Sequence, residues 1–86
     1  MEDIEFCKAD FLYMLSELNE YAVMNDVKDV WITNNTKVGW IDLAHFSDSY
    51  ENGNRNIHIS LNLDTHDTAY EKYERMMKCM KEGALL

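Results

Sequence analysis

The stretch Asn56–Leu63, with the sequence Asn-Ile-His-Ile-Ser-Leu-Asn-Leu, alternates polar and apolar residues without a break. Successive side chains of a β-strand point to opposite faces of a sheet, so this alternation predicts a strand with one buried face. The apolar side of the predicted strand carries Ile57, Ile59, Leu61 and Leu63. A sheet built around this strand needs other elements to cover that side.

Two segments upstream predict the other strands of the sheet. Lys28–Thr33 is rich in β-branched and aromatic residues and precedes the turn signal Asn34-Asn35, and Val38–Phe46 is similarly apolar. The polar residues 47–55 contain Asn-Gly and predict a hairpin connection. Alternation assigns Val30, Ile32, Ile41 and Leu43 to the covered face, and Trp31, Trp40, Asp42 and His58 to the open one. A bulge at Gly39 that turns an indole inward, or cross-strand pairing that covers each ring, is the alternative to two exposed tryptophans.

Helical periodicity flanks the three strands. Apolar residues recur every three or four positions from Ile4 to Val23, which predicts a long first helix. Thr68–Glu71 fits a capping box for a second helix, with Asp64 or Thr65 as an earlier start and Gly83 as its end. Its predicted inner face consists of Ala69, Tyr73, Met76, Met77, Met80 and Ala84. The fold expected for residues 1–86 is one α+β domain, a two-layer sandwich of order α-β-β-β-α with an antiparallel meander sheet.

The composition narrows the classes of function. The 86 residues have a net charge of -8 and are 47% hydrophobic, a combination that argues against disorder and against direct binding to nucleic acid or an anionic membrane. The acidic start and the absence of a run of about 20 apolar residues favour a cytoplasmic location. Cys7 and Cys79 are expected to be reduced thiols in or near the core.

No residue pattern in the chain indicates catalysis. Asp64-Thr65-His66-Asp67 matches no metal-ligand spacing, neither cysteine belongs to a Cys/His signature, and three glycines are too few for a phosphate loop. We therefore expect no enzyme activity, no metal and no cofactor.

The negative charge is concentrated near the start of the chain. Residues 2–29 contain eight acidic residues and two lysines, a net charge of -6. On a helical projection the side opposite the core forms a second stripe of residues, which consists of Phe6, Asp10, Tyr13, Glu17, Glu20 and Met24. Three interpretations of its aromatic and methionine side chains are open. They pack against the sheet or the second helix, or they form a homodimer contact. Alternatively, they anchor an interface with a basic protein, whose approach the neighbouring acids steer.

The profile of a small acidic α-β-β-β-α domain resembles phage-encoded counter-defence proteins, the anti-CRISPR inhibitors and antirestriction DNA mimics. The resemblance covers the whole chain in size, charge and element order, and it rests on no motif. It implies that Asp and Glu side chains stand in for phosphates and block the nucleic-acid groove of a Cas or restriction nuclease inside the bacterial host. The candidate partner-binding residues are Asp10, Tyr13, Glu17, Glu20, Asp26, Asp29, Trp31, Trp40, Asp42, Asp48 and Glu51.

Two further interpretations use the same surfaces. An immunity protein or antitoxin would neutralise a basic toxin, and a small adaptor subunit would use the second stripe of the first helix as a permanent interface. The element order is also similar to that of a double-stranded-RNA-binding domain, but the second helix lacks that family's basic N-terminal patch and the net charge has the opposite sign.

Overall fold

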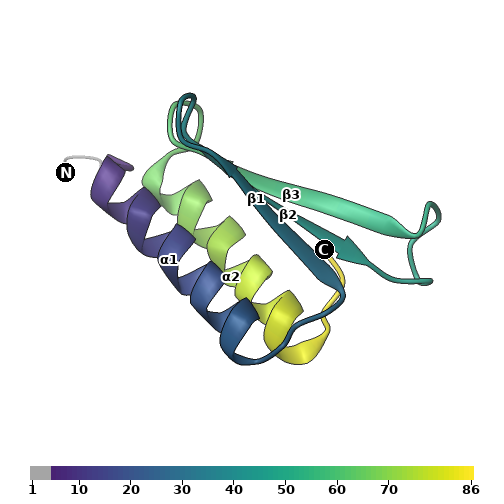
Figure 1. The fold of residues 1–86 in the computed structure, drawn as a ribbon. Coiled ribbons are helices and arrows are strands. Elements are labelled where there is room, and N and C mark those ends of the chain that lie inside the picture. The colour runs from purple at the N-terminus through teal and green to yellow at the C-terminus, as the bar shows by residue number, and fades with distance from the viewer. Residues whose placement is uncertain (1–4) are drawn as a thin grey trace.

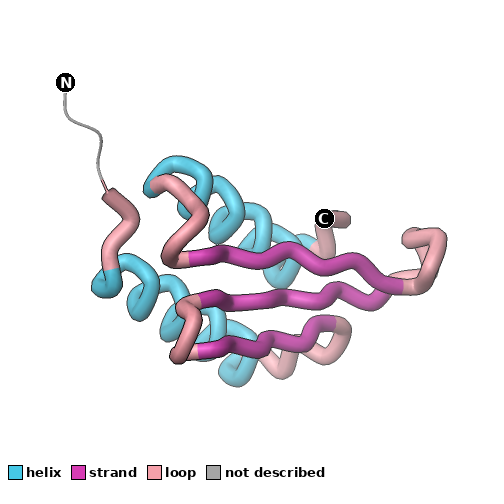
Figure 2. Tube along the Cα trace, turned by 90° about the horizontal axis from the view of Figure 1, so that it is seen from above, coloured by secondary structure: helices cyan, strands magenta, loops and turns pink. Residues whose placement is uncertain are grey.

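The structure is a computed structural model that describes residues 5–86. Its elements are α1 (Lys8–Met24), β1 (Val30–Asn35), β2 (Trp40–Phe46), β3 (Asn54–Ser60) and α2 (His66–Glu82) (Figure 1). The three strands form one antiparallel sheet in the order β1-β2-β3, and both helices cover the same face of it (Figure 2). The predicted α+β fold, with the order α-β-β-β-α, is confirmed.

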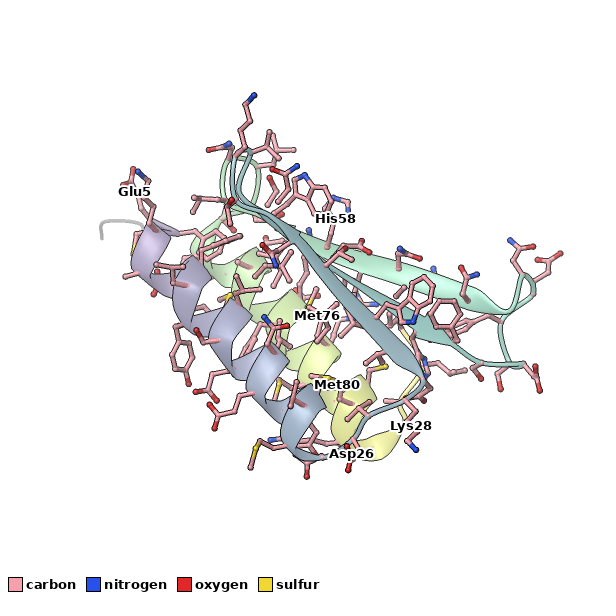
Figure 3. All side chains as sticks on the ribbon, viewed as in Figure 1. Glu5, Asp26, Lys28, His58, Met76 and Met80 are labelled. Atoms are coloured by element: carbon pink, nitrogen blue, oxygen red, sulfur yellow. The ribbon has the colours of Figure 1, made fainter. Side chains whose placement is uncertain are left out.

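The core lies between the sheet and the helix layer. Ile41 is paired with Ile59 and Leu43 with Ile57, so β2 and β3 present their branched apolar side chains on the same face. The two helices meet them with a second set of buried side chains, namely Phe11, Met14, Leu18, Ala69, Met76, Cys79 and Met80. Figure 3 shows Met76 and Met80 between α2 and the sheet. Each large side chain buried here contributes about 1.5–3 kcal/mol relative to an exposed one.

The starts of both helices differ from the first sequence prediction: α1 begins at Lys8, four residues after the predicted start at Ile4, and α2 is capped by Thr65, three residues before Thr68 of the predicted capping box. The N-cap of α1 is Cys7, whose backbone N–H donates to Asp10 Oδ2 at 3.3 Å, while the predicted start at Ile4 lies outside the described residues. Of the two earlier starts predicted for α2, Asp64 and Thr65, the structure has Thr65, whose Oγ1 accepts the Thr68 N–H at 3.2 Å. Gly83 ends α2 as predicted, with a left-handed φ of 71°.

The turn that joins β1 to β2 comes later than predicted. Asn34 and Asn35 belong to β1, not to a turn, because the pairing continues to Asn35 opposite Trp40. Asn35 Oδ1 then accepts the N–H groups of Lys37 and Val38, at 3.0 and 3.1 Å, a side-chain turn that starts the hairpin. Val38 therefore lies in the turn and not in the strand.

The prediction that β3 runs to Leu63 is wrong. The strand ends at Ser60, and Leu63 is 85% exposed and not part of an apolar face. Asp64 ends the strand: its Oδ2 accepts the Ser60 N–H at 2.8 Å and its Oδ1 accepts from Lys72 Nζ at 2.9 Å. This largely buried carboxylate ties the end of β3 to α2, and that tie forces the chain to turn before alternation can continue.

Gly39 allows the β1–β2 turn to pack against the chain that follows β3. Its φ is +76°, its carbonyl oxygen accepts the Leu61 N–H at 2.7 Å, and a Cβ at this position would lie 2.9 Å from Leu61 Cβ. Gly53 has a similar φ of +82° with open space around it. The two glycines therefore share a backbone requirement and differ in packing.

We predict that Gly39→Ala lowers the free energy of unfolding by more than Gly53→Ala does. Both variants carry the left-handed strain of about 1–2 kcal/mol, and only the first adds a clash with Leu61. Urea denaturation of the two variants measures the difference. Leu61→Gly, which removes the clashing Cβ, should cost less in the Gly39→Ala background than in the native protein, and equal losses for the two glycines would refute the packing role of Gly39.

Candidate functional site

Both helices lie on one face of the sheet (Figure 2), and we call the side chains of the other face the open face. The register and the two-residue repeat place on it Trp31, Thr33, Asn35, Trp40, Asp42, Ala44, Phe46, Asn54, Asn56, His58 and Ser60. Figure 3 shows His58 on the side of the sheet away from the helices. Trp31, Trp40, Asp42 and His58 therefore lie on the face that the sequence assigned to them.

Trp31 is the most exposed aromatic side chain on the open face. The residue is 68% exposed, and its ring meets that of Phe46 edge-on, with centroids 5.2 Å apart and an interplanar angle of 65°. Trp31 is directly opposite the small Ala44, so Phe46 two positions further along β2 is in diagonal reach. This cross-strand pair covers part of each ring and leaves most of the indole in solvent.

A shallow hollow on the same face is lined by Trp40, Asp42 and His58. Trp40 and Asp42 are two residues apart on β2, and His58 is the β3 partner of Asp42. Asn56 Nδ2 donates to Asp42 Oδ2 at 2.9 Å, which fixes the carboxylate at the edge of the hollow. The hollow combines an indole, a carboxylate and an imidazole.

The acids Asp48 and Glu51 lie in the connection between β2 and β3. Both are exposed, and this connection projects beyond the ends of both helices (Figure 1). It is braced from within, because Ser47 N–H donates to the Gly53 carbonyl at 3.0 Å and Gly53 N–H donates to the Tyr50 carbonyl at 3.0 Å. The two carboxylates thus extend the open face at one end.

The second predicted surface, on α1, is only partly available to a partner. Asp10 caps its own helix, and Tyr13 packs against Tyr73 of α2, with ring centroids 6.2 Å apart. Glu17 is half-buried and close enough to Tyr73 to contribute, after burial and Tyr13, to raising the pKa of that phenol to about 12. Among the six residues of the predicted stripe, Glu20 and Met24 are fully directed to solvent, and Tyr13 is about half-exposed.

Phe6 was wrongly assigned to that stripe. It is 8% exposed and packs against Phe11, with ring centroids 6.4 Å apart, because α1 does not begin until Lys8 and Phe6 approaches the core as extended chain. The helical projection that put Phe6 on the outer side therefore does not apply to it. Cys7 was likewise expected in or near the core, and as the N-cap it is exposed.

Asp26 and Asp29 lie in the connection between α1 and β1, where Figure 3 labels Asp26. Asp26 is exposed, with a φ of 49° that is unusual for a residue other than glycine. Asp29 Oδ2 accepts from His45 Nε2 at 3.0 Å, while the side chain of Asp29 remains about half-exposed. Asp29 is therefore both a surface acid and a structural acceptor.

His45 is the centre of a buried polar chain that the sequence did not reveal. Its Nδ1 lies 2.9 Å from Tyr50 Oη, which accepts the Leu86 N–H at 2.6 Å. Because a carboxylate only accepts, Asp29 holds the proton on Nε2, and in the neutral imidazole Tyr50 donates its hydroxyl to Nδ1. This series of hydrogen bonds links the start of β1, the end of β2, the hairpin and the C-terminal segment. The available signal was that His45 shares the inward alternation of Ile41 and Leu43.

The polar residues of the Asp64-Thr65-His66-Asp67 run, which matches no metal-ligand spacing, make contacts within the fold. Asp64 is engaged by Lys72, and the His66 ring packs against that of Tyr70, with centroids 4.6 Å apart. Within residues 5–86 no group of three or more His, Cys, Asp and Glu side chains is placed to hold a metal ion. Neither helix in the described part of the chain is long and apolar enough to cross a lipid bilayer.

Comparisons with protein-family models, with curated proteins and with solved structures found no match to this chain. The interpretation of the open face therefore depends on its own geometry and charge.

We predict that Tyr50→Phe lowers the free energy of unfolding by about 1–3 kcal/mol, because it leaves the Leu86 N–H and His45 Nδ1 without their partner. Tyr21→Phe is the matched control, since it keeps the ring that lies below Lys81 Nζ, and we expect a loss within about 0.5 kcal/mol. Urea denaturation measures both. Equal effects of the two variants would show that the polar chain does not stabilise the fold.

We predict that one thiol of the native protein reacts rapidly with an aromatic disulfide reagent at pH 8 and that the other reacts only on unfolding. Burial, with a smaller contribution from Asp29, raises the pKa of Cys79 to about 11, so this thiol stays protonated and enclosed, whereas Cys7 is exposed. Cys7→Ser should remove the rapid phase, and Cys79→Ser should leave it unchanged. Rapid reaction of both thiols would mean that α2 opens readily.

Proposed function

We propose that this chain is a non-catalytic inhibitor that binds a basic protein through its open face. The specific target that we propose is the nucleic-acid groove of a Cas or restriction nuclease in the bacterial cytoplasm, where the chain would act as an anti-CRISPR or antirestriction protein. The observation that carries the proposal is Trp31, 68% exposed beside Phe46 on a sheet face that none of the described helices and strands covers. Large exposed aromatic side chains that form contiguous patches mark interaction sites.

The open face supplies what affinity requires. Tryptophan and tyrosine are prominent among the few residues that dominate binding energy, because they bury a large area with little loss of conformational freedom. Exposed ion pairs contribute only about 0.2–1 kcal/mol each. Trp31, Phe46 and Trp40 thus serve as anchors, and the carboxylates at the border of the face contribute less to the affinity.

The acids supply steering toward a basic surface. The net charge of -8 favours approach to a positive groove and disfavours approach to DNA itself. Asp48 and Glu51 are at one end of the open face, and Asp26 and Glu20 extend the negative surface around the turn between α1 and β1. Release of counterions from the groove, as on binding of DNA, makes such association weaken as salt rises.

The decisive experiment adds the protein to a panel of purified Cas and restriction nucleases and measures displacement of labelled DNA between 50 and 300 mM salt. We predict competitive displacement from at least one nuclease, with affinity that falls as salt rises. Binding without displacement of DNA would overturn the groove-blocking mechanism. If the protein binds no nuclease of the panel but neutralises a basic toxin, the immunity-protein interpretation replaces the nuclease proposal.

Two pairs of variants test which surface binds. Trp31→Ala should reduce affinity by at least about 10-fold, as expected for an aromatic anchor, and Val23→Ala, at a residue 72% exposed on α1, should not. Asp48→Lys/Glu51→Lys should slow association, whereas Glu71→Lys/Glu74→Lys on the outer side of α2 makes the same change in net charge and should have a smaller effect. If the α2 pair is as damaging as the hairpin pair, only the total charge matters, and the open face is not the interface.

A further inference from the structure

We infer that the hollow formed by Trp40, Asp42 and His58 is a seat for one arginine side chain of the partner. The inference rests on the proposed function, since it names the group on a basic protein that the open face recognises. It concerns residues other than Trp31, whose role as an anchor can be tested separately.

The first observation is the pairing of an indole with a fixed carboxylate. Trp40 and Asp42 project from the same face of β2, and both line the hollow. A cation over an aromatic ring is attracted by the ring quadrupole, and tryptophan is the best of the aromatic side chains in this role. The adjoining carboxylate can accept N–H bonds from the same cation, so the two groups select for positive charge together.

The second observation is that Asp42 has no cation of its own on the sheet. Arg55 is the one lysine or arginine in β1, β2 and β3, and it belongs to the opposite face, where its Nη1 donates to the Leu86 carbonyl at 3.1 Å. Asn56 donates to Asp42 Oδ2 and leaves Oδ1 without a hydrogen-bond donor among the described residues. A carboxylate that is oriented by a neutral amide and faces an indole is complementary to a charge that comes from outside.

The third observation concerns the shape of the cation. A guanidinium group is planar, stacks on an aromatic face and presents several N–H donors in one plane, whereas the lysine ammonium is a compact and strongly hydrated charge. In a hollow with an indole on one side and a carboxylate on another, a guanidinium can use both at once. His58, directly opposite Asp42, also lines the hollow and contributes an imidazole that can accept a hydrogen bond when neutral.

The test uses small probes, so that it does not depend on a known partner. Nα-acetyl-arginine amide is titrated into the ¹⁵N-labelled protein, with Nα-acetyl-citrulline amide as a neutral control of the same shape and Nα-acetyl-lysine amide as a second cation. We expect saturable shifts of the Trp40 indole N–H and of the Asp42 and His58 amides, with little change at the Trp31 indole. Citrulline should produce no saturable shift, and lysine should bind more weakly than arginine. Equal shifts with citrulline, or equal shifts at both indoles, would overturn the seat.

Matched variants separate the charge of the hollow from the charge of the molecule. Asp42→Asn should weaken the arginine probe at least about 5-fold, as loss of the carboxylate leaves the aromatic contact alone, whereas Glu71→Gln on the outer side of α2 makes the same change in net charge away from the open face and should leave probe binding unchanged. An unchanged titration of a folded Asp42→Asn protein would refute the inference.

The two proposals fail in different ways. If Trp31→Ala abolishes nuclease binding and Asp42→Asn does not, the arginine seat is wrong and the proposed function stands. If the arginine probe binds Trp40 and Asp42 but no nuclease in the panel is displaced from DNA, the seat stands and the proposed function is wrong.

Discussion

The packing of Ile41, Leu43, Ile57 and Ile59 against two helices on one side of the sheet is the constraint on which the rest of the structure depends. A chain of 86 residues has two amphipathic helices with which to cover apolar strands, and both are used on the same face. The other face is consequently left to solvent, and every inward side chain of β2 and β3 has an outward neighbour. The open face exists because the core is built from alternating strands.

Much of this arrangement could be predicted from local patterns. Alternation in β2 and β3, helical periodicity in α1 and α2, and the glycine at the end of α2 are short-range signals, and they determine the element order and the faces of Trp31 and Trp40. The errors arose at the ends of elements, where one hydrogen bond or the position of a cap decides the outcome. Leu63 follows the end of β3, where Asp64 bonds to Ser60 and Lys72, and Phe6 precedes the N-cap of α1.

The burial of Cys79 follows the expectation of a thiol in or near the core, since this residue is almost fully buried. The polar chain around His45, in contrast, was not revealed by the sequence. The bond from His45 to Asp29 spans 16 positions and the bond from Tyr50 to Leu86 spans 36. Such pairs depend on the final register, which no local pattern contains. The same bonds change how much of the negative charge is available at the surface. Several acids that count equally in the net charge are engaged within the fold, by a helix cap, a lysine or His45.

The alternation of β2 also separates the residues that form the core from those that face outward, and this separation affects how the protein can evolve. Positions 41, 43 and 45 face the helices, and positions 40, 42, 44 and 46 face outward on the same seven-residue strand. Exchanging outward side chains alters the exposed surface without altering the volume of the core. Substitutions at alternate positions of one strand can thus change what that surface presents while the scaffold stays stable.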